Sequence, residues 1–276
     1  MVATPIGNLE DVTARALRVL RQVAVIAAED TRRTSRLLAR YGIDTPTTSL
    51  HAHNEATKSP AIIARLVQGD DVALVSDAGT PAISDPGQRV VRAALDRGVR
   101  VEAIPGPSAV MAALSASGLP ADRFAFLGFP PIHLRDRKKW LDQLRRTTGT
   151  VVFFEAPHRI RETLRQLYND FGDREVAIGR ELTKAHEEWV RGPISSVLSR
   201  LIAPLGEYTV VVDIGQSANI IDRKELEPGL LAAEIGELTK LAGYTKRKAI
   251  NVVARRHNLP PNEVYRAIEE AKKSVE

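Results

Sequence analysis

Runs of apolar residues alternate with amphipathic stretches through the first part of the chain. Stretches with apolar positions at helical spacing separate these runs and predict helices at 12–20, 31–41, 62–68 and 86–97. The short runs themselves are typical of buried strands and lie at 23–27, 72–75 and 99–104. Strands that alternate with helices through short loops favour a parallel α/β layer.

The pattern starts again after Gly118-Leu119-Pro120, where we place a domain boundary near residue 118. Two clear helices are predicted beyond it, at 157–169 and 193–202. Five strands are predicted, at 124–127, 150–154, 175–178, 187–191 and 208–214. Five strands with so few helices between them indicate a second, more antiparallel α/β domain. The fold class is therefore α/β, with domains at 1–118 and 119–217.

The last part of the chain is predicted to be helical. A polar stretch at 216–222 lacks periodicity and is interpreted as a linker. Helices are expected at 230–241 and 246–257, and a third begins at Pro261 after a tight turn. Three short helices in this order resemble a helix-turn-helix appendage, so we expect a small helical domain at 218–276.

The composition limits the classes of function. The 276-residue chain is 43% hydrophobic, which is enough for real cores, and has no apolar run near the roughly 18 residues that span a bilayer. The absence of cysteine excludes a disulfide scaffold, a thiolate zinc site and a cysteine nucleophile. We expect a cytoplasmic protein without a secretory signal before Thr4, and either a native N-terminus upstream of Met1 or a short first strand.

The formal net charge is +5 and the pI is about 9.5. This balance favours a polyanionic partner such as RNA, although many soluble proteins without such a partner are equally basic.

The stretch at 72–87 is the most informative part of the sequence. A short strand breaks into the turn-rich loop Ser76 to Pro81, and Asp85-Pro86-Gly87 then opens a helix. Loops at the carboxyl ends of strands bind ligands in α/β sheets, and small residues let the backbone approach a ligand. The chain has no Gly-x-Gly-x-x-Gly, P-loop or Gly-x-Ser-x-Gly motif, which argues against a dinucleotide fold, a kinase or an α/β hydrolase.

Several short segments carry a family resemblance. They are the 72–87 loop, Thr4-Pro5-Ile6-Gly7-Asn8-Leu9, Ala28-Glu29-Asp30-Thr31-Arg32, His51-Ala52-His53-Asn54-Glu55 and Pro105-Gly106-Pro107-Ser108-Ala109. In this order they resemble the tetrapyrrole methylase family from residue 2 to about residue 215. The closer resemblance is to the branch that methylates a cytidine ribose 2′-hydroxyl of small-subunit ribosomal RNA. It implies S-adenosylmethionine as methyl donor, two α/β domains and a homodimer.

The resemblance also implies a donor site made largely of backbone. Three loops of the first domain contribute to this site, in chain order the first, second and third loop. Their residues are Pro5, Ile6, Gly7, Asp77, Ala78, Gly79, Thr80, Pro81, Pro107, Ser108 and Ala109. The second domain completes the site with Phe154, Glu155, Tyr208 and Thr209. The alternative is that these are tight turns which need Gly and Pro for their geometry alone.

Three residues are candidates for catalysis. A ribose hydroxyl is a poor nucleophile, so a base or a charge that stabilises the alkoxide would help, and Asp30, Glu181 and Lys184 could supply either. Lys184 would need a depressed pKa to act as a base. Asp30 could equally cap a helix, and Glu181 and Lys184 could form a surface ion-pair cluster. Holding the hydroxyl in line with the methyl group could supply much of the rate.

Basic side chains are expected to contact RNA phosphates. Arg32 and Arg33 lie at a strand-to-helix junction, and His53 lies in a polar loop. The charge-rich helix at 133–146 adds Arg135, Arg137, Lys138 and Lys139, although such a helix can be a solvated face only. A metal site at His51 and His53 is conceivable, but we expect none, because methyl transfer from a sulfonium needs no metal.

These observations predict an S-adenosylmethionine-dependent enzyme that methylates a cytidine 2′-hydroxyl of small-subunit ribosomal RNA. Its partners would be that RNA and a second copy of the chain, with no membrane. Two alternatives remain at this point: a porphyrinoid methylase of the same fold, and a non-catalytic RNA-binding assembly factor.

Overall fold

The computed structural model describes residues 1–201, 205–215, 228–240, 244–256, 264–266 and 268–269. The chain forms two compact units. The first combines Met1–Trp140 with Gly149–Ile214, and the second combines Leu141–Thr148 with Gly215–Glu276. The domain boundaries expected from the sequence stay a prediction.

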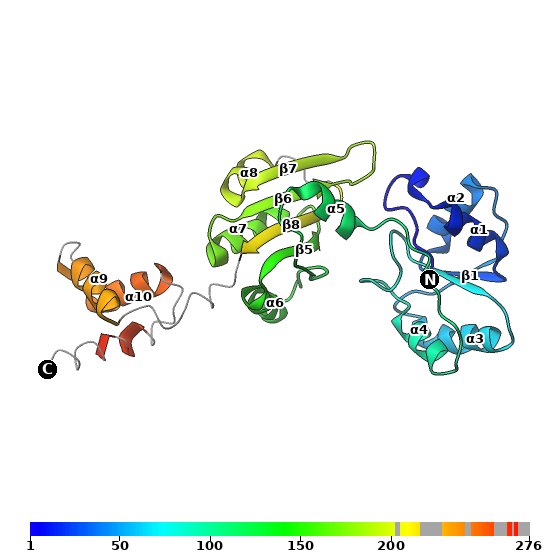
Figure 1. Ribbon diagram of the computed structural model, residues 1–276, viewed down its shortest axis with the longest axis horizontal. Helices are drawn as coiled ribbons and strands as arrows, with labels where there is room; N and C mark the ends of the chain where they lie inside the picture. The colour runs from blue at the N-terminus through cyan, green and yellow to red at the C-terminus, as the bar shows by residue number, and fades with distance from the viewer. Residues whose placement is uncertain (202–204, 216–227, 241–243, 257–263, 267, 270–276) are drawn as a thin grey trace. The chain divides into compact units, whose positions relative to one another are not determined.

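The amino-terminal sheet is parallel, as predicted, which confirms the α/β fold class. Its central strand β1 (Val25–Ala28) pairs with β2 (Thr47–Ser49) on one side and β3 (Val72–Val75) on the other. All four residues of β1 are buried, as expected for a strand covered on both faces. Four helices accompany this sheet: α1 (Ala14–Gln22), α2 (Thr31–Arg40), α3 (Glu55–Val67) and α4 (Gln88–Leu95) (Figure 1).

Two strands differ from the prediction. The sequence Thr-Thr-Ser of β2 carries no apolar signal, so its periodicity could not reveal it. The predicted strand at 99–104 was wrong. Only Ile104 forms a bridge there, to Val2, with the Ala3 N–H donating to the Ile104 carbonyl at 3.2 Å. The Val2 N–H donates to Leu74 O at 2.9 Å, so the first residues of the chain lie beside β3.

Three helices begin at other residues than the hydrophobic periodicity predicted, and for two of them the residue before the helix explains the difference. The helix expected from residue 12 begins at Ala14, because the Thr13 side chain caps it by accepting from Ala16 N–H at 3.0 Å. Helix α4 begins at Gln88 because Gly87, at φ 127°, holds a conformation that helices do not contain. Helix α3 begins seven residues before the predicted start at 62, and it continues through Pro60.

The second sheet has five strands in the order β4-β5-β8-β6-β7. Strands β4 (Phe124–Phe126) and β5 (Gly149–Glu155) are parallel. Strand β6 (Glu175–Arg180) runs antiparallel to both β7 (Glu188–Pro193) and β8 (Tyr208–Gly215), which confirms the more antiparallel character. Its helices are α5 (Ala109–Ser117), α6 (Leu134–Arg146), α7 (Ile160–Phe171) and α8 (Ile194–Arg200).

Each sheet has its own core. Ile26, Ala28 and Val75 pack against Leu20 of α1 in the first. In the second, Val152, Ala177 and Val211 pack against Ala113 and Leu114 of α5, so the helix that follows the third loop is anchored on the second sheet. A short 3-10 helix, η1 (Leu9–Asp11), ends the first loop.

The described tail is helical, as predicted. Helices α9 (Pro228–Lys240) and α10 (Lys246–Arg256) bury a small core that Val264 and Ile268 complete. The predicted linker at 216–222 and the start of the third helix at Pro261 lie outside the described residues. Among the helices that the structure describes, none combines the length and apolar character needed to cross a bilayer.

Candidate functional site

The three loops predicted to hold the donor converge around Gly79. The Thr4 N–H donates to Gly79 O at 2.9 Å, and the Gly79 N–H donates to Thr4 O at 3.0 Å. A Cβ placed on Gly79 would lie 3.3 Å from the Ile6 side chain and 3.7 Å from Pro107 O. Gly79 also has φ 76°, which favours glycine. The contacts bring loops from three distant parts of the sequence to one edge of the first sheet.

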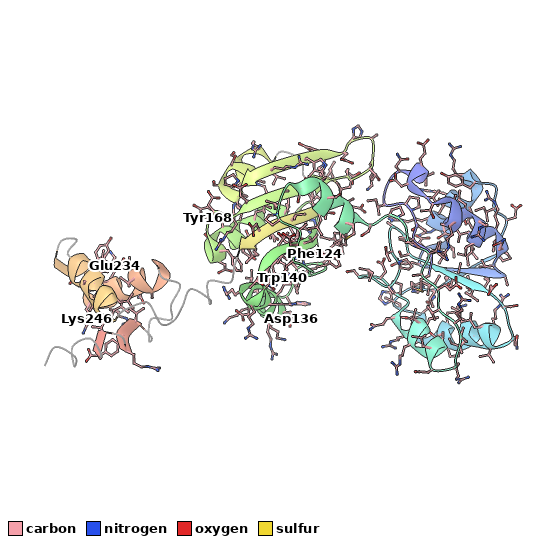
Figure 2. All side chains as sticks on the ribbon, viewed as in Figure 1. Phe124, Asp136, Trp140, Tyr168, Glu234 and Lys246 are labelled. Atoms are coloured by element: carbon pink, nitrogen blue, oxygen red, sulfur yellow. The ribbon has the colours of Figure 1, made fainter. Side chains whose placement is uncertain are left out.

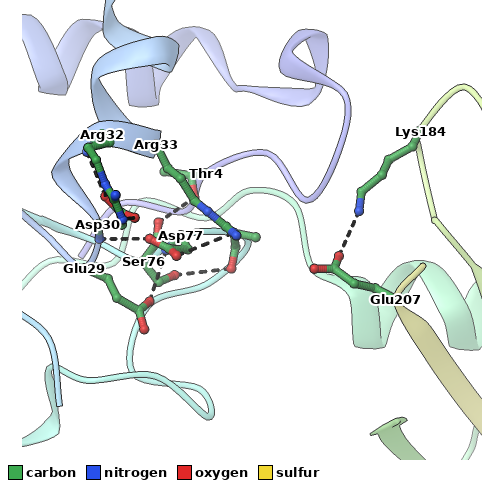
Figure 3. Close-up of polar contacts among 10 residues, drawn as sticks. Thr4, Glu29, Asp30, Arg32, Arg33, Ser76, Asp77, Lys184 and Glu207 are labelled. Atoms are coloured by element: carbon green, nitrogen blue, oxygen red, sulfur yellow. Dashed lines mark hydrogen bonds and ion pairs between the residues drawn. The ribbon is translucent and has the colours of Figure 1, made fainter. Parts of the chain in front are cut away.

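Asp77 links the ends of β1 and β3 in this region. Its Oδ1 accepts from the Asp30 N–H at 2.9 Å, and its Oδ2 lies 3.5 Å from Arg33 Nη1 (Figure 3). The Asp77 N–H donates to Glu29 Oε2 at 3.2 Å. Both carboxylates therefore stand at the carboxyl ends of parallel strands, where α/β sheets bind ligands.

Asp85 adds a third acid. Burial and the neighbouring charge of Glu29 raise the pKa of Asp85 to about 6, and Asp77 contributes in the same direction. A group of acids that repel one another is suited to a cationic ligand. The residues present therefore fit S-adenosylmethionine, which carries a sulfonium and an ammonium charge: Glu29, Asp77 and Asp85 would supply the opposite charge, and the loops around Gly79 the backbone contacts.

Replacing Asp85 by asparagine should stabilise the protein near neutral pH. Because the pKa of Asp85 is raised on folding, the free energy of unfolding falls as pH rises from about 4 to about 6 and stays lower above. Solvent screens this half-exposed side chain, so we expect Asp85→Asn to add about 1 kcal/mol at pH 7 and little at pH 4. Urea unfolding at several pH values measures this, with exposed Asp44→Asn as control. A gain that does not depend on pH would contradict the assignment.

Asp30 caps α2, as one of its two interpretations predicted. Its Oδ1 accepts from the Arg32 N–H at 2.9 Å, and Arg32 binds the carboxylate with Nε at 3.1 Å and Nη2 at 2.8 Å. The hydrogen bond with Arg32 lowers the pKa of Asp30 to about 2. A carboxylate with such a pKa is a poor general base at neutral pH, and a catalytic role of Asp30 stays a prediction.

The turn at 181–184 holds Lys184 between two carboxylates. Its Nζ donates to Glu181 Oε1 at 3.0 Å. It also donates to Glu207 Oε2 at 2.9 Å, and this second contact is drawn in Figure 3. Glu181 and Thr183 have φ 51° and 64°, a strained conformation for residues other than glycine. Backbone strain of this kind is common at functional sites.

The ionisation of this turn does not suit a base. Burial alone would lower the pKa of Lys184, but the hydrogen bonds to Glu207 and Glu181 outweigh it and the pKa is raised. Burial raises the pKa of Glu181. The hydrogen bonds from Lys184 and the Glu207 N–H together outweigh burial, so the pKa of Glu181 is lowered overall. A lysine base needs a depressed pKa, so Lys184 is a held cation instead.

The first loop meets this turn at Gly7. The Asn8 N–H donates to Thr183 Oγ1 at 3.0 Å. A Cβ on Gly7 would lie 2.5 Å from Lys184 Cγ and 2.8 Å from Leu182 O, so glycine is required for the approach.

Gly7→Ala should therefore disturb Lys184. The lysine stem can move but the Leu182 carbonyl cannot without shifting the turn, and we expect a loss of about 1–3 kcal/mol in the free energy of unfolding. Gly236→Ala in α9 is the matched control, since its Cβ would meet nothing within 4 Å and alanine should stabilise a helix by up to about 1 kcal/mol. Chemical denaturation distinguishes the two, and equal effects would refute the contact.

The remaining residues of the three loops differ in exposure. Pro5 and Pro81 are buried, Pro107 and Ala109 are half-buried, and Ala78 and Thr80 are exposed. The Ser108 hydroxyl caps α5 by accepting from the Met111 N–H at 3.4 Å. Their contacts with a donor stay a prediction.

The four residues predicted on the second sheet are mostly enclosed. Tyr208 and Thr209 are buried on β8, and half-buried Phe154 packs against Phe126 with ring centroids 5.0 Å apart. The Glu155 carboxylate is fully buried and accepts from Thr163 Oγ1 at 2.5 Å, with Arg159 Nε at 3.4 Å. Glu155 already has these partners, so a donor contact through its side chain would have to replace them.

One predicted RNA contact needs correction. Arg137 is 7% exposed, and its guanidinium donates to Thr163 Oγ1 at 2.6 Å, Gln166 Oε1 at 2.5 Å and Pro131 O at 3.3 Å. Burial makes it unavailable to a phosphate. Arg135, Lys138 and Lys139 are exposed on α6, and Arg32 and Arg33 are 88% and 60% exposed.

The two histidines are neighbours but do not form a metal cluster. His53 is exposed, His51 is half-buried, and their ring centroids are 6.1 Å apart. Within the residues described, no group of three or more His, Asp or Glu side chains is placed to hold a metal ion.

The sequence did not single out Glu29, Glu207, Asp85 or Arg159 for a role. Glu29 and Asp85 lie within the segments that carry the family resemblance, and Glu207 directly precedes the predicted donor residue Tyr208. Arg159 follows β5 and gives no signal, because its partners Pro130 O and Glu155 meet only in the fold.

The fold and site define an α/β protein in which three loops converge beside the acidic residues Glu29, Asp77 and Asp85 at one edge of the first sheet. The chain belongs to the tetrapyrrole (corrin/porphyrin) methylase family, whose model matches residues 1–198. Solved structures of the same fold include diphthine synthase, with TM-score 0.59 and 17% identity over 76% of this chain and 88% of that one. Another is the methyltransferase CobJ, with TM-score 0.57 and 18% identity over 77% and 91%.

Among curated relatives, the chain is 42% identical over 269 residues to "Ribosomal RNA small subunit methyltransferase I" of Bacillus subtilis. That match covers 97% of this chain and 92% of the relative. The protein of the same name from Pseudomonas aeruginosa is 51% identical over 68% of this chain and 67% of the relative.

Proposed function

We propose that this chain transfers a methyl group from S-adenosylmethionine to the ribose 2′-hydroxyl of a cytidine in small-subunit (16S) ribosomal RNA. The observation that carries the proposal is the 42% identity to a ribosomal RNA small subunit methyltransferase over 97% of the chain. The convergence of the three loops on Gly79, beside Glu29, Asp77 and Asp85, supports the donor.

The residues of the chain divide the work. When bound, S-adenosylmethionine supplies an electrophilic methyl group on its sulfonium. The loops around Gly79 hold it through backbone groups, and the three acids complement its positive charge. Transfer of that methyl group to the 2′-oxygen would break the carbon–sulfur bond and leave S-adenosylhomocysteine, and the hydroxyl proton would pass to solvent.

Positioning and charge account for the rate better than a base does. Asp30 and Glu181 have lowered pKa values and Lys184 a raised one, so none is matched to proton abstraction at neutral pH. The Lys184 ammonium group, held by Glu181 and Glu207, stabilises negative charge that develops on the 2′-oxygen.

Exposed cations bind the RNA backbone in this proposal. Arg32 pairs with Asp30, Arg33 pairs with Asp77, and Arg135, Lys138 and Lys139 lie on α6. Salt weakens such contacts, because phosphates release counterions on binding. We further propose that the protein acts in the cytoplasm as a homodimer, in keeping with the family resemblance.

The test is methyl transfer from labelled S-adenosylmethionine to purified small ribosomal subunits, with corrinoid precursors in a parallel reaction. The proposal predicts label in the RNA and none in the corrinoid. Label in the corrinoid alone would favour a small-molecule methylase, and RNA binding without donor binding would favour an assembly factor.

A further inference from the structure

The segment between β4 and α6 displays large apolar side chains to solvent. Phe129 is 58% exposed, and Ile132 and Leu134 are 77% and 84% exposed. Among the large apolar side chains that the structure describes, Ile132 and Leu134 are the two most exposed. Single exposed apolar residues are ordinary, but three within six positions form a patch that calls for a partner. The patch is defined here as Phe129, Ile132 and Leu134.

Two arginine side chains, buried Arg137 and half-buried Arg159, hold the backbone of this patch in place. Arg159 Nη2 donates to Pro130 O at 2.5 Å, and Arg137 Nη1 donates to Pro131 O at 3.3 Å. Before the patch, the Phe154 N–H donates to Gly128 O at 2.8 Å. Burying an arginine costs free energy unless its charge and donors are matched. Here the two arginines fix the backbone of a segment whose side chains face water, so the exposure is built into the fold.

Phe129 is oriented as an aromatic platform. Its ring packs at 56° on Phe154, with centroids 5.3 Å apart, and Phe154 in turn packs on Phe126. The ring is thus supported from the protein side while more than half of the side chain stays exposed. Supported aromatic rings of this kind stack with unpaired bases in proteins that bind single-stranded RNA.

The helix that follows the patch carries cations on its outer side. Arg135 and Lys138 are exposed and belong to the first turns of α6, and Lys139 pairs with Asp136 at 2.9 Å. Figure 2 shows Asp136 projecting from α6, whereas Trp140 of the same helix packs against the sheet, 5.3 Å from Phe153. An apolar platform beside cations matches a nucleotide, which presents a flat base and an anionic phosphate.

We propose that the patch binds unpaired nucleotides of the RNA substrate, with a base stacked on Phe129 and the adjoining phosphates at Arg135 and Lys138. This inference rests on the proposed function and extends it to a base-binding surface. It places RNA recognition on a rigid segment of 128–138 and gives buried Arg137 a positioning role. Charge complementarity favours RNA over a second copy of this basic chain.

The test compares variants of the full chain in binding a short fluorescent single-stranded RNA and the matching duplex, by anisotropy. Phe129→Ala should weaken single-strand binding about 5- to 150-fold, the range for loss of one stacked base, and change duplex binding little. Phe129→Trp should retain the affinity. Tyr168→Ala on α7 is the matched control, since Tyr168 is another exposed aromatic residue (Figure 2).

Further readouts separate the possible outcomes. Arg135→Glu with Lys138→Glu should also weaken binding, and should reduce its salt dependence. Donor binding and melting temperature should be unchanged in the double charge reversal, and Phe129→Ala should still fold. Unchanged single-strand affinity in that variant overturns the inference, and a change in sedimentation alone would assign the patch to a protein interface. If wild-type protein methylates no ribosomal RNA, the proposed function fails instead.

Discussion

Lys184→Met is expected to lower the rate of methyl transfer about 100- to 1,000-fold, the range for removal of one group that stabilises a developing oxyanion. Methionine keeps the length of the side chain and removes the charge. The ammonium group lies between Glu181 and Glu207, so the change also leaves two carboxylates facing each other. Turnover on small subunits under single-turnover conditions measures the effect, and donor affinity should change little.

Lys184→Arg is the matched control and should retain most of the activity, because arginine keeps the charge. The pH profile tells a held cation from a base. Since the pKa of Lys184 is raised above the ordinary value, its charge and its ion pairs persist below about pH 10 and are lost only above that. The rate should therefore show no ionisation of Lys184 between about pH 6 and 9. If the pH–rate profile of the wild type shows an ionisation in this pH range, and that ionisation disappears in Lys184→Arg, then Lys184 is the base.

Asp77→Ala is expected to weaken binding of S-adenosylmethionine about 10- to 150-fold, the range for one lost charge-assisted hydrogen bond. Asp77 joins the ends of β1 and β3, and it accepts from the Asp30 N–H and pairs with Arg33. Its loss removes a negative charge from the acidic edge and releases both partners. Isothermal titration with the donor measures the change.

Asp70→Ala provides the control for Asp77→Ala. Asp70 lies before β3 and pairs with Arg65 on the surface at 2.7 Å. Its replacement by alanine should leave donor affinity unchanged. Asp77→Asn separates charge from geometry, because its amide oxygen still accepts from Asp30. If Asp77→Ala binds the donor as wild type does, Asp77 is only a structural link between the strands.

The parts of the site that follow strand ends could be predicted from the sequence. Thr4 to Leu9, Asp77 to Pro81 and Pro107 to Ala109 follow apolar runs, and the carboxyl ends of parallel strands share one edge of a sheet. Of these, only Asp77 to Pro81 follows a strand of the observed sheet, and the other two loops reach Gly79 through the isolated bridges of Thr4 to Gly79 and of Val2 to Ile104.

Features that depend on contacts between distant residues could not be predicted. Arg137 stands in the sequence among basic residues that are exposed. Arg137 itself is buried, because the packing of α6 on α7 turns it toward Thr163 and Gln166. Likewise the raised pKa of Lys184 depends on Glu207, which is 23 positions away in the sequence. The segment 99–104 shows the opposite error. Its apolar run predicted a strand, but it forms only a single bridge, at Ile104.

The central claim is tested most directly by incubating the protein with labelled S-adenosylmethionine and small ribosomal subunits, then mapping the labelled nucleotide by nuclease digestion. The account predicts one labelled nucleotide, a 2′-O-methylcytidine, in wild type and strongly reduced label in Lys184→Met. Label on a base instead of a ribose, or no label in RNA from a protein that binds the donor, would contradict it.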